Sequence, residues 1–235
     1  MAFPAPVDAT PDRFRGLAQI ADQPCQQHCD QCVEVCPVQA ISKNKTIHID
    51  LGRCTFCGQC QIVCPEKKIE FTRDYRLAVR QRDDLILPEH QPQVDALQGQ
   101  MKKLFGRSLK LRQVSAGGCN GCEVDINVLA TLAFDLGRFG IQIVASPRHA
   151  DGLIVTGPVS HNMYTALQKT YDAVPSPKLV IAVGACAISG GIFRDHEQVH
   201  NGIEGILPVD VYIPGCPPHP LTILDGLVRL MGRIK

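Results

Sequence analysis

The fold of the front of this 235-residue chain is decided by Leu51-Gly-Arg-Cys-Thr-Phe-Cys-Gly-Gln-Cys-Gln-Ile-Val-Cys-Pro65. The four cysteines, Cys54, Cys57, Cys60 and Cys64, follow the spacing Cys-x2-Cys-x2-Cys-x3-Cys-Pro. That spacing places three thiolates on one short loop around an iron-sulfur cube and sends the fourth to a neighbouring cube. The stretch therefore predicts an iron-sulfur site.

An earlier run of cysteines supplies a second quartet. In chains with two such runs, the last cysteine of each run binds the cluster of the other run. We therefore expect two [4Fe-4S] clusters, held by an exchange that ties both halves of the segment together. The first set of ligands is Cys25, Cys29, Cys32 and Cys64, and the second set is Cys36, Cys54, Cys57 and Cys60.

The first run departs from the usual spacing, because three residues rather than two separate Cys25 from Cys29. The inserted residue has two interpretations. Either the loop is one residue longer and Cys25 still binds the cluster, or His28 replaces a thiolate, as imidazole does in some clusters. Cys25 is the favoured ligand, since all-cysteine ligation is usual for cubes.

Two other uses of the thiols fit less well. Disulfide frameworks belong to small secreted chains, and no charged segment followed by an apolar stretch, as in an export signal, is visible between Met1 and Pro11. Zinc sites commonly pair two Cys-x2-Cys knuckles across a longer spacer. A cytosolic redox protein is therefore expected, with a zinc-stabilised scaffold as the weaker alternative.

The charge balance argues against a role in binding polyanions. The chain holds 24 Lys and Arg against 23 Asp and Glu, and residues 1–80 are as balanced as the rest. Nucleic-acid proteins concentrate basic charge on one face. The longest strongly apolar stretch, residues 179–188, is about half of what a bilayer-spanning helix needs. We expect no nucleic-acid partner, and only indirect contact with a membrane.

The cysteines and prolines divide the chain into four expected segments: an N-terminal extension at 1–20, an α+β two-cluster domain at 21–80, a linker with a short amphipathic helix at 81–105, and a larger domain at 106–235. The two-cluster domain is too small for much of a core, so ligation is expected to supply a large part of its folding free energy.

Beyond residue 106, short β-type runs alternate with helical ones. Strands are expected near 108–114, 141–145, 153–155, 179–183 and 209–213, and helices near 123–136, 163–173 and 221–231. The strand at 179–183 is apolar on both faces, as in a parallel sheet covered by helices. The alternation predicts an α/β fold, a flavodoxin-like parallel-sheet sandwich. Gly137 is expected to cap the first helix in the left-handed conformation.

The remaining four cysteines each follow a predicted strand. The carboxyl ends of parallel strands share one edge of a sheet, so these distant residues are expected to converge there. Flanking glycines would let backbone amides approach cluster sulfurs closely. A third [4Fe-4S] cluster is therefore predicted on Cys119, Cys122, Cys186 and Cys216.

Several motifs of the larger domain carry a resemblance to a known family. They are Cys119-Asn-Gly-Cys-Glu123, Ser146-Pro-Arg-His-Ala-Asp151, Gly184-Ala-Cys-x3-Gly-Gly-Ile-Phe193 and Val209-Asp-Val-Tyr-Ile-Pro-Gly-Cys-Pro-Pro218. Residues 106–235 thereby resemble the small subunit of membrane-bound [NiFe]-hydrogenases of the formate hydrogenlyase type, in the superfamily of the complex I 20 kDa subunit. The front of the chain is similar to the two-cluster ferredoxin subunit of such complexes, here fused to the small subunit.

The resemblance implies a function and a set of partners. The third cluster would lie proximal to a Ni-Fe centre on a separate large subunit, and the chain would be an electron-transfer subunit with no catalytic centre of its own. Membrane subunits and an electron donor or acceptor, such as a formate dehydrogenase or ferredoxin module, would complete the complex on the cytoplasmic face of the membrane. A complex-I-like subunit that delivers electrons to quinone is the alternative.

Glu123 adjoins the proposed ligand Cys122 at the start of a predicted helix. Carboxylates are favoured there by the helix dipole, so capping is the expected role. A proton relay to the partner subunit is a further hypothesis for this side chain.

Overall fold

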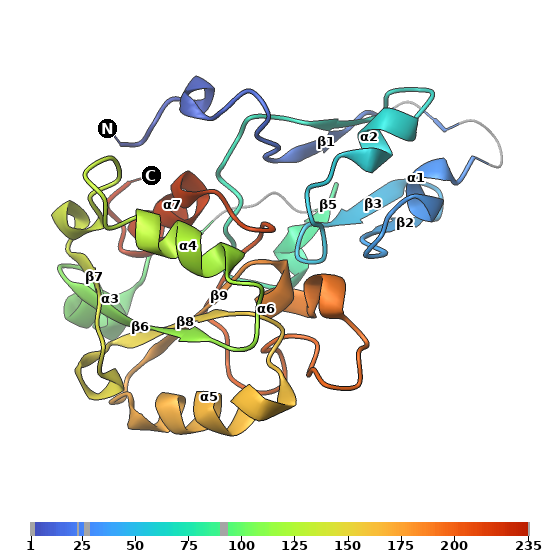
Figure 1. Ribbon diagram of the computed structural model, residues 1–235. Helices are drawn as coiled ribbons and strands as arrows, with labels where there is room; N and C mark the ends of the chain where they lie inside the picture. The colour runs from blue at the N-terminus through green and yellow to red at the C-terminus, as the bar shows by residue number, and fades with distance from the viewer. Residues whose placement is uncertain (1–2, 23, 26–28, 90–93, 235) are drawn as a thin grey trace.

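The computed structural model describes residues 3–22, 24–25, 29–89 and 94–234. Figure 1 shows a small N-terminal unit, coloured blue to cyan, beside a larger sheet unit coloured green to red. The N-terminal stretch before β1 lies beside the sheet unit. The chain therefore passes between the two units more than once.

The N-terminal unit consists of two small antiparallel sheets and two short helices. Strand β1 pairs with β4, and β3 lies between β2 and β5. Helices α1 and α2, which carry cysteines of the two motifs, pack against each other. The elements are β1 (Ala18–Ile20), α1 (Gln31–Glu34), β2 (Ile41–Lys43), β3 (Ile47–Asp50), α2 (Gln59–Val63), β4 (Ile69–Phe71) and β5 (Ile86–Leu87), with 3-10 turns η1 (Val7–Ala9) and η2 (Asp83–Leu85).

The larger unit is built on five parallel strands in the order β10-β9-β8-β6-β7. Numbered along the chain, this is the 2-1-3-4-5 order of flavodoxin-like sheets. The α/β fold class predicted from the sequence is confirmed. The strands are β6 (Leu109–Ser115), β7 (Ile141–Ile143), β8 (Gly152–Thr156), β9 (Leu179–Val183) and β10 (Val211–Ile213).

Helices cover both faces of this sheet, which is why the central strands are apolar throughout. One face, with Ile154 and Ile181, packs on α4 and α7. The other face, with Val155 and Ala182, packs on α5 and α6. The helices are α3 (Gly99–Phe105), α4 (Gly121–Val128), α5 (His161–Ala173), α6 (Ala185–Ser189) and α7 (Pro220–Leu230), with 3-10 turns η3 (Leu136–Phe139), η4 (Pro147–His149) and η5 (Gly191–Phe193).

The helix expected at 123–136 is shorter than the sequence pattern indicates, because α4 ends at Val128. The hydroxyl of Thr131 donates to the carbonyl of Val128 at 2.7 Å, a local bond that competes with the helix. Leu132 is 97 % exposed, so a longer helix would gain no burial there. The expectation for Gly137 was also wrong: the residue lies inside η3, and the left-handed positions are Asp135 and Gly140.

The segment expected to be a linker is packed onto both units. Strand β5 pairs with β3, and the amide of Leu97 donates to the carbonyl of Leu230 at 2.8 Å. Helix α3 covers only 99–105 of the expected helical stripe, with Phe105 buried and Leu104 half exposed. Between the two units, Val79 forms an antiparallel bridge with Tyr212.

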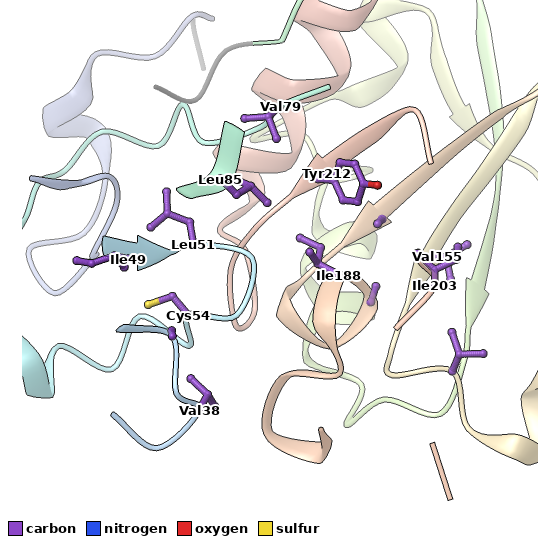
Figure 2. Close-up of a cluster of buried hydrophobic side chains, with 14 of the residues drawn as sticks. Val38, Ile49, Leu51, Cys54, Val79, Leu85, Val155, Ile188, Ile203 and Tyr212 are labelled. Carbon is purple, nitrogen blue, oxygen red and sulfur yellow. The ribbon is translucent and has the colours of Figure 1, made fainter. Parts of the chain in front are cut away.

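One hydrophobic core runs across the junction of the two units. Figure 2 shows Leu51 and Leu85 of the N-terminal unit on the side towards Ile188 and Tyr212 of the sheet unit, with Ile49 farther back in the same cluster. A continuous core fixes the relative position of the two units, because sliding one past the other would expose apolar surface. In the described part of the chain, no helix is long and apolar enough to cross a membrane.

Candidate electron-transfer sites

The second set of cysteines surrounds one apolar cavity in the N-terminal unit. Cys36, Cys54, Cys57 and Cys60 all line it, together with apolar side chains such as Ile49 and Phe71. Burial, and then the nearby thiols Cys60, Cys36 and Cys57, raise the pKa of Cys54 to about 12. Mutual repulsion of this kind requires the four sulfurs to lie close together. Cys36 comes from the first run, and the structure places it with the thiols of the second run.

The first set is brought together in the same way. Burial, followed by the charges of Cys64, Cys25 and Cys29, raises the pKa of Cys32. The Nζ atom of Lys43 on β2 donates to the carbonyl oxygen of Cys29 at 2.5 Å and to Asp30 at 3.2 Å, which anchors the longer loop. His28, the alternative ligand, lies outside the described residues.

Backbone amides point at the sulfurs of both sets. Ala40 N donates to Cys36 Sγ at 3.2 Å, and Phe56 N donates to Cys54 Sγ at 3.2 Å. Lys68 N donates to Cys64 Sγ at 3.3 Å. Hydrogen bonds to sulfur are one of the means by which proteins set cluster potentials.

The third set lies on one edge of the parallel sheet. Cys119 and Cys122 follow β6, Cys186 follows β9 in α6, and Cys216 follows β10. Burial, and then Cys216 and Cys119, raise the pKa of Cys186 to about 11. Burial also raises the pKa of Cys122, with Glu123, Cys186, Cys216 and Cys119 adding to the rise. Residues far apart in sequence thus converge where the strand order predicts.

Glycines keep the space around the third set clear. A Cβ atom on Gly184 would lie 2.5 Å from Cys122 Sγ, and one on Gly191 would lie 2.7 Å from Cys186 Sγ. Both glycines have positive φ, at 89° and 56°. All twelve cysteines are free thiols. Buried thiols, amides aimed at sulfur and cleared space fit the donor set of iron-sulfur cubes.

Among residues 3–22, 24–25, 29–89 and 94–234, no three Cys, His, Asp or Glu side chains gather closely enough to hold one metal ion. A cube with its iron atoms at alternate corners needs more widely separated sulfurs than one tetrahedral zinc does.

A hollow of about 290 Å³ is lined by residues from the loop of the second set and from the loop of Cys216. Thr55 and Phe56, which follow Cys54, line one side, and Cys216 and Pro217 line the other. Arg13 and Arg15 from the N-terminal stretch line its rim. The loop after Cys54 and the loop of Cys216 therefore meet at the same hollow.

Glu123 lies in the first turn of α4, as the sequence predicts, and its side chain also binds two strand ends. Its Oε1 atom accepts hydrogen bonds from Ser115 Oγ at 2.5 Å and Thr156 Oγ1 at 2.6 Å. Ser115 and Thr156 are paired residues at the ends of β6 and β8. The buried carboxylate thus ties two strand ends beside the third set. Sequence reasoning missed both hydroxyls, although a polar residue at the end of each apolar strand was a usable signal.

Comparison with known proteins places the chain in a family. The model of the NADH ubiquinone oxidoreductase 20 Kd subunit matches residues 119–230, and a 4Fe-4S dicluster domain model matches residues 24–68. A probable membrane-bound hydrogenase subunit, mbhJ of Pyrococcus furiosus, is 42 % identical over 135 residues, which cover 57 % of this chain and 81 % of that protein. The chain belongs to the 20 Kd subunit family.

Two further proteins are similar to this chain over part of their length. Formate hydrogenlyase subunit 7 of Escherichia coli is 43 % identical over 142 residues, covering 60 % of this chain and 56 % of that protein. A chain in the structure of the membrane-bound sulfane sulfur reductase, an archaeal respiratory membrane complex, matches with a TM-score of 0.50 and 36 % identity, covering 56 % of this chain and 73 % of that one.

The family assignment confirms the resemblance found in the motifs. The N-terminal unit is a 4Fe-4S dicluster domain, which supports two clusters. The chain is an iron-sulfur electron-transfer subunit of the oxidoreductase class that includes membrane-bound hydrogenase, formate hydrogenlyase and complex-I-like assemblies.

Proposed function

We propose that the chain relays electrons through three [4Fe-4S] clusters to or from a Ni-Fe site on a separate large subunit of a membrane-associated hydrogenase or formate hydrogenlyase complex. The observation that carries this proposal is the convergence of Cys119, Cys122, Cys186 and Cys216 beside a dicluster domain. When bound, each cluster supplies one-electron redox chemistry.

The ligand sets follow the grouping of the thiols. Cys25, Cys29, Cys32 and Cys64 would hold the first cluster; Cys36, Cys54, Cys57 and Cys60 the second; and Cys119, Cys122, Cys186 and Cys216 the third. In this proposal the protein contributes burial, amides directed at sulfur and charge rather than acid-base groups.

The order of transfer is proposed to be first, second, third, or the reverse. Cys32 of the first set is close enough to raise the pKa of Cys60 in the second set, after the larger effects of burial and Cys57. The second set is tied to the third by the packing of Gly52 against Ile188, where an added Cβ would lie 2.9 Å from Ile188 Cγ2.

The large subunit is proposed to dock over the third set. Cys119 is exposed, and Val124 and Ile192 beside the motifs are 51 % and 59 % exposed. Exposed apolar residues grouped around a redox site are typical of a surface that a partner covers. Membrane subunits and a formate dehydrogenase or ferredoxin module would complete the complex at the cytoplasmic face of the membrane.

A complex-I-like subunit that passes electrons to quinone is the second candidate, favoured by the description of the family model itself. The sequence of the accompanying large subunit distinguishes the two. Paired Cys-x2-Cys motifs at its two ends would supply nickel ligands and support the hydrogenase assignment. A large subunit without them would favour quinone or another acceptor.

Analysis of iron and acid-labile sulfide tests the three-cluster proposal directly. Protein purified without oxygen is expected to contain about twelve iron atoms and an equal amount of sulfide per chain. A content of about eight iron atoms per chain would contradict the third cluster. Stoichiometric zinc with little sulfide would instead support a metal-stabilised scaffold without redox function.

A further inference from the structure

An arginine from the N-terminal stretch lies directly on the turn that carries the second cysteine motif. A Cβ atom built on Gly58 would lie 2.4 Å from Arg15 Nε and 3.0 Å from Arg15 Cζ. Gly58 has φ of 77° and stands between Cys57 and Cys60. The guanidinium therefore rests against the backbone of the loop that surrounds the second set of thiols.

No acidic partner accounts for the position of Arg15. In the parts of the chain that the structure describes, its guanidinium makes no ion pair or hydrogen bond. Asp125 lines the same hollow, and burial raises the pKa of its carboxyl. The side chain thus brings a positive charge against the cysteine loop, and within the described residues no carboxylate is paired with it.

A cube bound by four thiolates carries net negative charge, and reduction adds one more. A cation beside it stabilises the reduced state more than the oxidised state, and local charge is one of the factors that set cluster potentials. Because Arg15 and Cys57 are exposed, solvent screens part of the effect.

We propose that Arg15 raises the reduction potential of the second cluster and so sets the driving force of the electron step between the second and third clusters. The inference rests on the proposed ligand sets. Arg15 is not a catalytic residue in this inference, because its charge acts only on the reduction potential of the cluster.

The chain offers a matched control for this charge. Arg13 lies two residues away on the same stretch and lines the same hollow, whereas the three atoms nearest to a Cβ on Gly58 all belong to Arg15. Replacing either arginine by glutamine removes the same charge from the same segment. R15K keeps the charge at Arg15 while losing the planar fork.

The experiment is a redox titration of the complete chain followed by low-temperature paramagnetic resonance. The signal of the second cluster is identified by its change in C57S. R15Q is expected to shift the reduction equilibrium of that cluster about tenfold toward the oxidised form, which is about 59 mV for one electron. R13Q is expected to shift it less, and R15K is expected to stay near the wild-type value.

Equal shifts in R15Q and R13Q, or no shift in R15Q with all twelve irons present, would overturn the inference and leave the proposed function intact. If R15Q lost the second cluster, R15K would decide. Loss of that cluster in R15K as well would make the role purely structural and overturn the inference, whereas a wild-type potential in R15K would support it. Absence of iron and sulfide in the wild-type protein would instead overturn the proposed function.

Discussion

The hydroxyl of Ser189 donates a 2.9 Å hydrogen bond to the carbonyl oxygen of Gly52. Ser189 ends the helix that carries Cys186, and Gly52 lies two residues before Cys54. The bond is buried and joins residues 137 positions apart. It ties the loop of the second set to the helix that carries Cys186, so tertiary structure decides how these two sets lie relative to each other.

Replacing Ser189 by alanine removes the donor and leaves the carbonyl of Gly52 buried without its partner. The expected loss is about 1–3 kcal/mol in the free energy of unfolding. Thermal unfolding of the reconstituted protein measures it. S42A is the control, because Ser42 is exposed and makes no tie between the units. Equal effects of the two substitutions would contradict the importance of this bond.

Gly184→Ala is expected to abolish the third cluster alone. The new Cβ would lie 2.5 Å from Cys122 Sγ, and φ of 89° is strained for alanine. Iron should fall from about twelve to about eight per chain, with the two N-terminal clusters retained. Gly205→Ala is the matched control, since φ there is 77° but no atom lies within 4 Å of the added Cβ. Twelve irons in G184A would show that the loop can yield.

Lys43→Gln is expected to weaken the first cluster, because the bond from Nζ to the carbonyl of Cys29 holds the lengthened cysteine loop. On exposure to air, the variant should lose iron from the first cluster faster than the wild-type protein does. The decay of the paramagnetic signal of that cluster measures this loss. Lys45→Gln, an exposed lysine on the same hairpin, provides the comparison. Identical decay in both variants would remove this role from Lys43.

The ligand at the irregular position is tested by two substitutions. C25S is expected to remove or convert the first cluster, because a serine oxygen is a poorer ligand for iron-sulfur cubes than a thiolate. H28A is expected to leave all three signals unchanged. The reverse pattern would assign the site to His28.

Removal of iron is expected to unfold the N-terminal unit while the parallel sheet stays folded. The sheet unit has its own large core around Leu111, Ile181 and Leu227, whereas the N-terminal unit gathers its apolar residues around the thiols. Hydrogen exchange of the chelated protein should show loss of protection in β2 and β3 but not in β8 and β9. Protection retained throughout would show that the shared core suffices without metal.

The sequence alone determined the chemistry of this protein. The regular spacing of Cys54 to Cys64 specifies a cube-binding loop, because a short run of thiols has few other geometric uses. The apolar strand at 179–183 specified a parallel sheet covered on both sides, and strand ends then placed Cys119, Cys186 and Cys216 on one edge. These features are local, because they depend on residues that are close together in the sequence.

Tertiary structure alone decided how the sites relate to one another. The bond from Ser189 to Gly52, the pair of hydroxyls on Glu123 and the contact of Arg15 with Gly58 each join residues from different elements. The periodicity of apolar residues in the sequence does not predict such contacts, because they depend on how the two units pack over a common core. The early end of α4 has the same origin, because the exposure of Leu132 is set by its surroundings and not by helix propensity.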